Sequence, residues 1–246
     1  MRIVSDYATC IHESKSTHLW ALVILGLLLL PVGCSGKKDG EAPAIPSYGG
    51  TGTAKAAPGT QGVQPSKISL GVLLPGGDVK MVGTDDEEHS LDSAATEKGL
   101  LVIFTCNHCP WVKAWEARTV ALGNSAQKKG IGVIAVNPND PKAYPEDGIE
   151  EMKERAQRAG MEYPYVVDAT SEVGRAFGAD KTPEIFLFDG ERKLVYRGTI
   201  DDNAQAPQAV KKKYLKDAIE AVSKGAAVPV SETKALGCSI KYRPEA

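Results

Sequence analysis

Two cysteines separated by two residues stand where a strand is expected to give way to a helix. Cys106 and Cys109 follow the apolar run of residues 100–105 and come just before Pro110. The unpaired N–H groups and partial positive charge of a helix N-terminus stabilise a thiolate. The spacing also lets the second thiol reach the first and close a small disulfide loop. These residues therefore predict a redox-active Cys106–Cys109 pair.

His108 lies between the two cysteines, and an imidazolium there favours the thiolate over the disulfide. We expect Cys106 to be the more exposed, attacking thiolate and Cys109 to resolve the mixed disulfide. His108 is then expected to lower the pKa of the nucleophile. A reduced form stabilised in this way makes the pair more oxidising. We expect a reduction potential above the roughly −270 mV of thioredoxin, towards the roughly −180 mV of protein disulfide isomerase.

A pair with this spacing has two other interpretations. It can form half of a zinc site, but structural zinc takes four ligands. The chain has no second pair of this kind, and its four histidines are His12, His18, His89 and His108. We therefore expect no metal and no other cofactor. A static structural disulfide is the second alternative, which the strand-to-helix position disfavours because that position activates a thiol.

Composition excludes two other classes of protein. The 246 residues carry a net charge of −2, so the chain lacks the basic excess that nucleic-acid binding needs, and we expect no nucleic-acid partner. Its five cysteines are too few for a small fold held together by disulfides.

The N-terminal segment predicts export. Residues 19–32 form an uncharged apolar run that is shorter than the about 20 residues of a membrane-spanning helix and fits the apolar region of a signal peptide. Cys34 follows at once, which resembles a bacterial lipoprotein signal and implies lipidation of Cys34, although Pro31 stands where leucine is usual. We expect residues 1–34 to be such a signal and the protein to be an exported, periplasmic-facing, membrane-anchored lipoprotein. An uncleaved anchor, another exported form and a cytoplasmic protein remain alternatives.

The rest of the chain divides into a linker, a domain and a tail. Residues 35–66 are rich in glycine, proline and alanine, which predicts a flexible linker. The domain is expected over residues 67–225 and the tail over 226–246. Its expected strands are residues 68–74 and 79–82, paired as a hairpin, then 100–105, 131–137, 165–168, 184–189 and 193–197. Its expected helices are residues 110–126, which Gly123 could end early, 146–159, 171–177 and 208–224. This alternation predicts an α/β fold, a mixed central sheet with helices on both faces.

With these motifs in view, the chain resembles the thioredoxin-like superfamily over residues 68–225. It is most similar to the redoxin group (alkyl hydroperoxide reductase/thiol-specific antioxidant, AhpC/TSA) and its peroxiredoxin-like members with a Cys-x-x-Cys site. The segments that carry this resemblance are residues 101–110, 132–137, 165–168, 173–178 and 181–189. It implies a thioredoxin-like fold in which Thr182-Pro183 holds a cis-proline facing the cysteines, with the Thr182 backbone binding substrate. Trp111 and Trp115, one turn apart, either line the substrate groove or pack in the core.

Two departures from the family pattern affect the chemistry. Thioredoxin has a buried Asp six residues before its first cysteine, where this chain has Leu100, so another group or water must take the proton. Peroxiredoxins have Pro and Thr where this chain has Val102 and Cys106. The second departure favours disulfide exchange over peroxide reduction.

The expected function is therefore that of an exported thiol–disulfide oxidoreductase. Its expected partners are protein disulfide or dithiol substrates, an electron donor, and the membrane through the N-terminal anchor. One alternative is a peroxiredoxin-like thiol peroxidase. Another is a copper-binding protein, although no histidine follows His108 to complete such a site. Cys238 is either a single thiol buried under a packed tail or a third redox thiol that exchanges with the pair.

Overall fold

Uninterrupted apolar runs become the central strands of the sheet in the computed structural model, which describes residues 66–244. Strands β3 (Gly99–Phe104), β4 (Gly132–Asn137) and β7 (Glu184–Asp189) are almost entirely buried. The strand order is β2-β1-β5-β4-β3-β7-β8. The remaining members are β1 (Met81–Gly83), β2 (Glu88–His89), β5 (Tyr165–Val167) and β8 (Leu194–Gly198). Because β3 runs parallel to β4 and antiparallel to β7, the sheet is mixed, as predicted.

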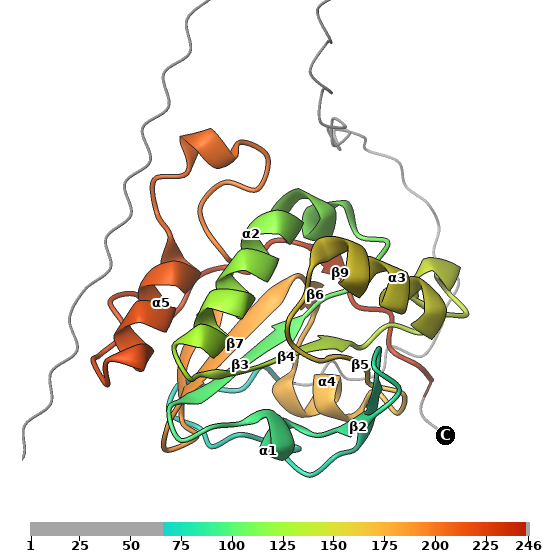
Figure 1. Ribbon diagram of the computed structural model, residues 1–246, viewed down its shortest axis with the longest axis horizontal. Coiled ribbons are helices and arrows are strands. Elements are labelled where there is room, and N and C mark those ends of the chain that lie inside the picture. Colours follow the sequence, from blue (N-terminus) through green and yellow to red (C-terminus); the bar gives the residue numbers. More distant parts are fainter. Residues whose placement is uncertain (1–65, 245–246) are drawn as a thin grey trace, which may run out of the picture. The chain divides into compact units, whose positions relative to one another are not determined.

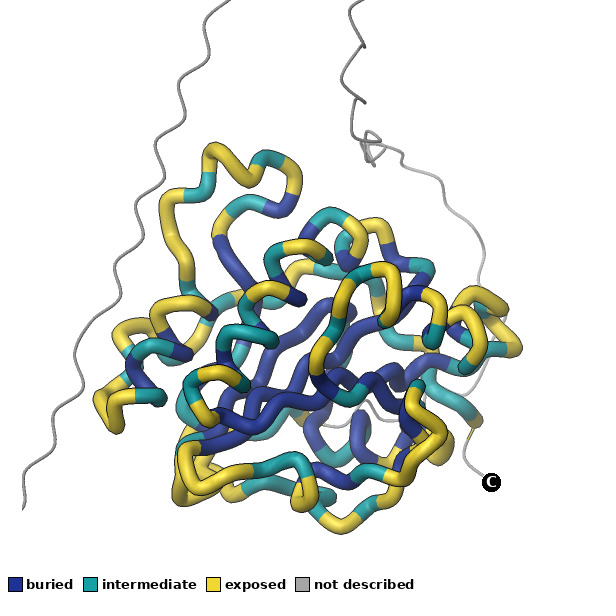
Figure 2. The backbone as a smooth tube through the Cα atoms, in the orientation of Figure 1, coloured by how far each residue is buried: buried dark blue, intermediate teal, exposed yellow. Residues whose placement is uncertain are grey.

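Strand β3 is buried along its length (Figure 2). Its successive residues pack into two separate cores, one on each face of the sheet. Leu101 and Ile103 pack in the core that also contains Trp115, Met152 and Leu215. Leu100, Val102 and Phe104 pack with Leu91 and Phe177. The first face is covered by α2 (Pro110–Lys128), α3 (Ile149–Ala159) and α5 (Tyr214–Ser223), the second by α1 (Leu91–Ala94) and α4 (Glu172–Phe177) (Figure 1). The expected α/β, thioredoxin-like fold with helices on both faces is confirmed.

Helix α2 continues through Gly123, where the sequence allowed an early end. A Cβ atom at Gly123 would lie 2.3 Å from Cε1 of Tyr163. The absence of a side chain at Gly123 therefore lets the Tyr163 ring pack closely against α2, and the glycine does not end the helix.

Two other expectations about the elements were wrong. Residues 68–74 and 79–82 do not form a hairpin, because the backbone N–H groups of Gly71 and Leu74 bind the carbonyls of Leu194 and Arg192. The first hairpin in the sequence of the domain is formed instead by β1 and β2. The last helix begins at Tyr214 rather than 208, after a short 3-10 helix, η2 (Pro207–Ala209).

A two-stranded sheet near the cysteine pair has no counterpart in the sequence prediction. It joins β6 (Lys181–Thr182) to β9 (Cys238–Ser239), so that Thr182 pairs with Cys238. The chain beyond residue 225 therefore returns to the domain (Figure 1).

The expected signal segment, Cys34 and the linker up to residue 65 lie outside the described residues. Between residues 66 and 244, the structure has no helix that is both long and apolar enough to cross a membrane.

Candidate active site

The cysteine pair lies in the loop that connects β3 to α2. Strand β3 ends at Phe104, and Cys109 is the N-cap residue of α2, with Pro110 at its first position. Proline is favourable there because the first N–H groups of a helix have no partner within it. The pair thus occupies the predicted strand-to-helix position, but Cys106 and Cys109 are both 0% exposed.

Thr182 contacts both cysteines from the opposite side. Its Oγ1 lies 3.2 Å from the Sγ of Cys106, and its carbonyl oxygen lies 3.1 Å from the Sγ of Cys109. The Thr182–Pro183 peptide bond is cis, as the resemblance implied. The structure therefore places Thr182 against the pair, with Pro183 next to it in the chain.

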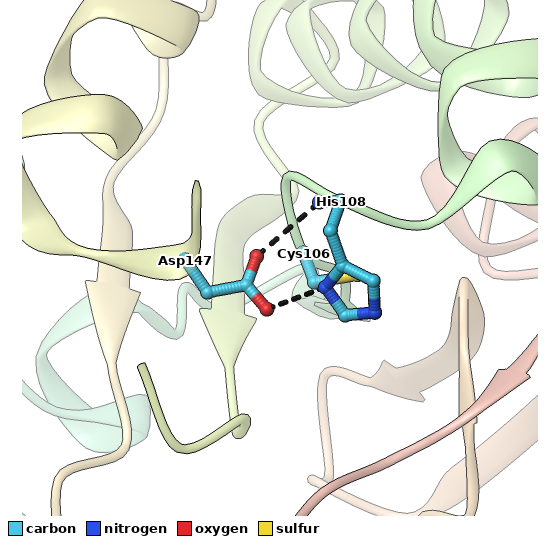
Figure 3. A group of neighbouring side chains, drawn as sticks. All are labelled: Cys106, His108 and Asp147. Carbon is cyan, nitrogen blue, oxygen red and sulfur yellow. Dashed lines mark hydrogen bonds and ion pairs between the residues drawn. The ribbon is translucent and has the colours of Figure 1, made fainter. Parts of the chain in front are cut away.

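His108 is paired with a buried carboxylate that the sequence did not suggest. Asp147, in the 3-10 helix η1 (Pro145–Asp147), lies 2.7 Å through Oδ2 from Nδ1 of His108 (Figure 3). Its Oδ1 accepts the backbone N–H of Asn107 at 2.6 Å and, more weakly, that of His108 at 3.4 Å. The ring of Tyr144 stacks on His108 with centroids 3.7 Å apart. The imidazole is thus held in one position, and an imidazolium there is neutralised by Asp147.

The backbone between the cysteines is held from three directions. Arg155 donates to the backbone carbonyl of Asn107 at 2.6 Å, and the Tyr165 hydroxyl donates to the side-chain Oδ1 of Asn107 at 3.1 Å. Asp147 provides the third contact, described above. Arg155 is itself buried and paired with Glu116 at 2.7 Å. Side chains from η1, α3 and β5 therefore fix the loop that presents the thiols.

The pKa values of the two thiols are shifted in opposite directions. The hydrogen bond with Cys109, burial and the negative charge of Asp147 raise the pKa of Cys106. The hydrogen bond from Cys106 is the main factor that lowers the pKa of Cys109 to about 5, with help from the Cys238 thiol and the backbone N–H of Val112. The expectation that Cys106 is the more exposed and more acidic thiol is corrected: both are buried, and Cys109 is the acidic one.

Cys238 and Trp111 lie directly beside the pair. The Sγ of Cys238 is 2.7 Å from the Sγ of Cys109, and Trp111 is a partly buried residue packed against the cysteines. Trp115 is fully buried and donates from Nε1 to Asp201 at 2.8 Å. Core packing therefore accounts for Trp115, whereas Trp111 borders the site.

One group near the site has the residue types of a metal centre. Potential ligand atoms of Cys106, His108 and Asp147 all lie within 4.8 Å of one another (Figure 3), the one such group of three in residues 66–244. Structural zinc takes four ligands, and the close contact between His108 and Asp147 already satisfies both groups. The expected absence of a metal stays a prediction.

Four residues of the site were missed by the sequence analysis: Tyr144, Asp147, Arg155 and Tyr165. The contact of Cys238 with the pair agrees with one of the two alternatives left open for that residue. Arg155 had a signal, because it lies three residues after Met152 on the buried side of α3. The other contacts join residues 36 or more positions apart, counted from His108 to Tyr144, and no local pattern reveals them.

Replacing Asp147 by asparagine is expected to lower the pKa of Cys106, because it removes the negative charge that opposes the Cys106 thiolate. The alkylation rate of Cys106 should then rise at lower pH than in the wild type. Iodoacetamide labelling of the reduced protein across pH, read by mass spectrometry of the Cys106 peptide, measures the shift. Glu146→Gln is the matched control, since Glu146 is exposed beside Asp147. An unchanged Cys106 profile in Asp147→Asn would contradict the assigned role of the charge.

Comparison with known proteins finds a family model and several similar structures for the domain. Residues 74–197 match the model of the AhpC/TSA family. Among solved structures, a hypothetical protein from Sinorhizobium meliloti 1021 is 31% identical, with a TM-score of 0.67 over 73% of this chain and 98% of that one. An uncharacterized conserved protein from Geobacillus kaustophilus is 35% identical, with a TM-score of 0.67 over 72% of this chain and 94% of that one.

A curated relative with a named activity matches a shorter part. The thiol-disulfide oxidoreductase ResA of Geobacillus thermodenitrificans (strain NG80-2) is 33% identical over 89 residues, which is 35% of this chain and 47% of the relative. The chain therefore spans about half the length of that relative.

Proposed function

The chain belongs to the AhpC/TSA family, and from this membership we propose that it is a thiol–disulfide oxidoreductase whose Cys106–Cys109 pair cycles between dithiol and disulfide. The observation that carries the proposal is the environment of the two thiols. They lie together at the N-terminus of α2, and hydrogen bonds from Cys106 and Cys238 lower the pKa of Cys109. The name of the curated relative supports the same chemistry.

The acidic thiol sets the order of the steps. The Cys109 thiolate attacks one sulfur of a substrate disulfide, and the other substrate sulfur leaves as a thiolate that takes up a proton. Cys106 then attacks the Cys109 sulfur of the mixed disulfide and releases the second substrate thiolate. Two electrons have passed to the substrate, and the Cys106–Cys109 disulfide remains. Run in reverse, the same steps oxidise a substrate dithiol.

Cys106 must lose its proton before it attacks, because its pKa is raised in the reduced protein. The side chains of His108 and Asp147 have polar atoms within 4.8 Å of the Cys106 sulfur, and we assign them the role of proton acceptor. Leu100, at the position of the thioredoxin carboxylate, is buried in the core on the other face of the sheet and takes no part. Thr182, Pro183 and Trp111 border the pair and are the proposed substrate contacts.

A thiol peroxidase is the second candidate, and the acidic Cys109 in an AhpC/TSA protein favours it. A peroxide would oxidise Cys109 to the sulfenic acid, and Cys106 would then form the disulfide with loss of water. Cys106 replaces the threonine expected around a peroxidatic cysteine, so exchange remains the leading proposal. Peroxide consumption with a dithiol reductant separates the two functions.

The location of the activity rests on the sequence alone. We propose that the protein is exported and membrane-anchored through Cys34, because an apolar run of signal-peptide length precedes that residue. Its substrates are then protein disulfides or dithiols outside the cytoplasm, served by a separate electron donor.

The reduction potential of the pair tests the proposed function. Stabilisation of the Cys109 thiolate favours the reduced form, so a reversible two-electron couple is expected between roughly −270 and −120 mV. Equilibration of the full chain with glutathione, followed by labelling of the Cys106 and Cys109 peptides, measures it. Cys109→Ser is the comparison and should abolish the couple. A pair without a reversible couple would overturn the proposal.

A further inference from the structure

Residues 231–241, which follow α5, are hydrogen-bonded to the rest of the domain on both sides of Cys238. On one side, backbone hydrogen bonds of 3.0 Å join Arg197 to Ser231 and Thr233. On the other, Ile240 donates to the carbonyl of Asp180 at 3.1 Å, and Asp140 donates to that of Lys241 at 2.8 Å. Figure 1 shows this segment, with β9, lying beside β6. The segment therefore belongs to the packed domain.

The pairing of β9 with β6 places the thiol of Cys238 next to the cysteine pair. The register of β6 and β9 places Cys238 opposite Thr182, the residue that contacts Cys106 and Cys109. Gly237 allows the approach, since a Cβ atom there would lie 2.2 Å from the carbonyl oxygen of Thr182. The resulting distance between the sulfurs of Cys109 and Cys238 is 2.7 Å. A shift of well under 1 Å would bring them to the about 2.05 Å of a disulfide bond.

Cys109 is therefore the central sulfur of a cluster of three thiols. It accepts a hydrogen bond from Cys106 on one side and from Cys238 on the other when it is ionised. Its two neighbours both have raised pKa values, that of Cys238 reaching about 12 through burial and the contact with Cys109. The same sulfur can accordingly bond to either neighbour.

We propose that Cys238 is a third redox-active residue, which exchanges with the Cys106–Cys109 disulfide to give a Cys109–Cys238 disulfide. This inference rests on the proposed function, which supplies the oxidised pair. Cys238 loses its proton and attacks the Cys109 sulfur, the Cys106–Cys109 bond breaks, and Cys106 leaves as a thiolate that takes up the proton. The step forms one disulfide and breaks one, so it needs no further oxidant.

Strand β9, which carries Cys238, pairs with β6 in the way that a bound peptide strand would. Adding an extended segment to a free strand edge is a common way for domains to bind peptides. Within residues 66–244, β9 is the strand that pairs with β6. The chain's own tail thus occupies the edge next to the dithiol and presents to it a cysteine, the side chain that a disulfide-exchange partner provides.

Trapping in the Cys106→Ser full chain tests the proposal. The reduced protein is treated with glutathione disulfide, quenched with acid, alkylated and digested without reduction. Glutathione first attaches to Cys109, and Cys238 then displaces it, so that the Cys109–Cys238 linkage should be found in the majority of molecules. If Cys109 instead stays glutathionylated while Cys238 remains free to alkylate, the proposal is overturned.

A relocated thiol provides the matched control. Cys106→Ser with Cys238→Ser and Ser239→Cys moves the thiol by one residue, to the other side of the strand. The linkage should then be lost, and an equal yield would overturn the proposal by showing that any thiol in the tail reacts. Wild-type protein in parallel must show the Cys106–Cys109 linkage. Its absence overturns the proposed function, whereas absence of the Cys109–Cys238 linkage in Cys106→Ser overturns only this inference.

Discussion

Replacing Cys109 by serine is expected to abolish disulfide exchange entirely, with a loss of turnover greater than about a thousandfold, as for other removed nucleophiles. Cys109 is the acidic thiol and contacts both Cys106 and Cys238. Its removal takes away the nucleophile and the sulfur that both proposed disulfides share. In the variant the contacts with Cys109 that raise the pKa values of Cys106 and Cys238 are lost, but burial of both thiols still opposes their ionisation.

The measurement is reduction of a model disulfide, together with non-reducing peptide mapping after oxidation. Cys106→Ser is the informative comparison, because it keeps Cys109 and should still form a mixed disulfide with substrate while failing to resolve it through Cys106. If Cys109→Ser retained turnover and Cys106→Ser lost the mixed disulfide, Cys106 would be the nucleophile, and the assignment from the thiol environments would be wrong.

Replacing Gly237 by alanine is expected to displace β9 and expose the cysteine pair. The added Cβ would lie 2.2 Å from the carbonyl oxygen of Thr182, and the backbone around it has to move. Overpacking of this kind costs about 1–3 kcal/mol. If that cost falls on the paired state of the tail, the open state gains about 5- to 140-fold in population, at tenfold per 1.4 kcal/mol.

The alkylation rate of Cys109 in the reduced protein follows this opening, since Cys109 is fully buried when β9 is paired. It should rise by a similar factor in Gly237→Ala. Leu236→Ala is the control, because Leu236 is an exposed neighbour in the same segment and its truncation adds no atom. Unchanged labelling in Gly237→Ala would show that the tail does not limit access to the pair.

The sequence was sufficient for the parts of this fold that depend on local periodicity. Continuous apolar runs marked β3, β4 and β7 to within about one residue, because a strand buried on both faces has no polar positions. The short strand β1 overlaps the expected strand at residues 79–82, whereas β2, β6 and β9 were missed. Two or three residues carry too little periodicity to reveal a strand, and their pairing is decided by distant segments.

The site divides in the same way. Cys106, Cys109 and Thr182-Pro183 were identified from motifs and the resemblance, and the structure brings them together. The acidity of the thiols could not be predicted, because Asp147 and Cys238 reach the pair only through the fold. His108 alone suggested a positive environment, and its carboxylate partner reverses that suggestion for Cys106.

The number of sulfur atoms in the cluster has a simple consequence. A disulfide consumes sulfurs two at a time, and Cys106, Cys109 and Cys238 are three. Whichever bond forms among them, one sulfur is left over. The fully oxidised centre thus still carries a nucleophile, so a thiol count of the oxidised domain, residues 66–244, should return one rather than zero. When a substrate binds the oxidised protein, the remaining thiol of the cluster can therefore attack the disulfide formed by the other two.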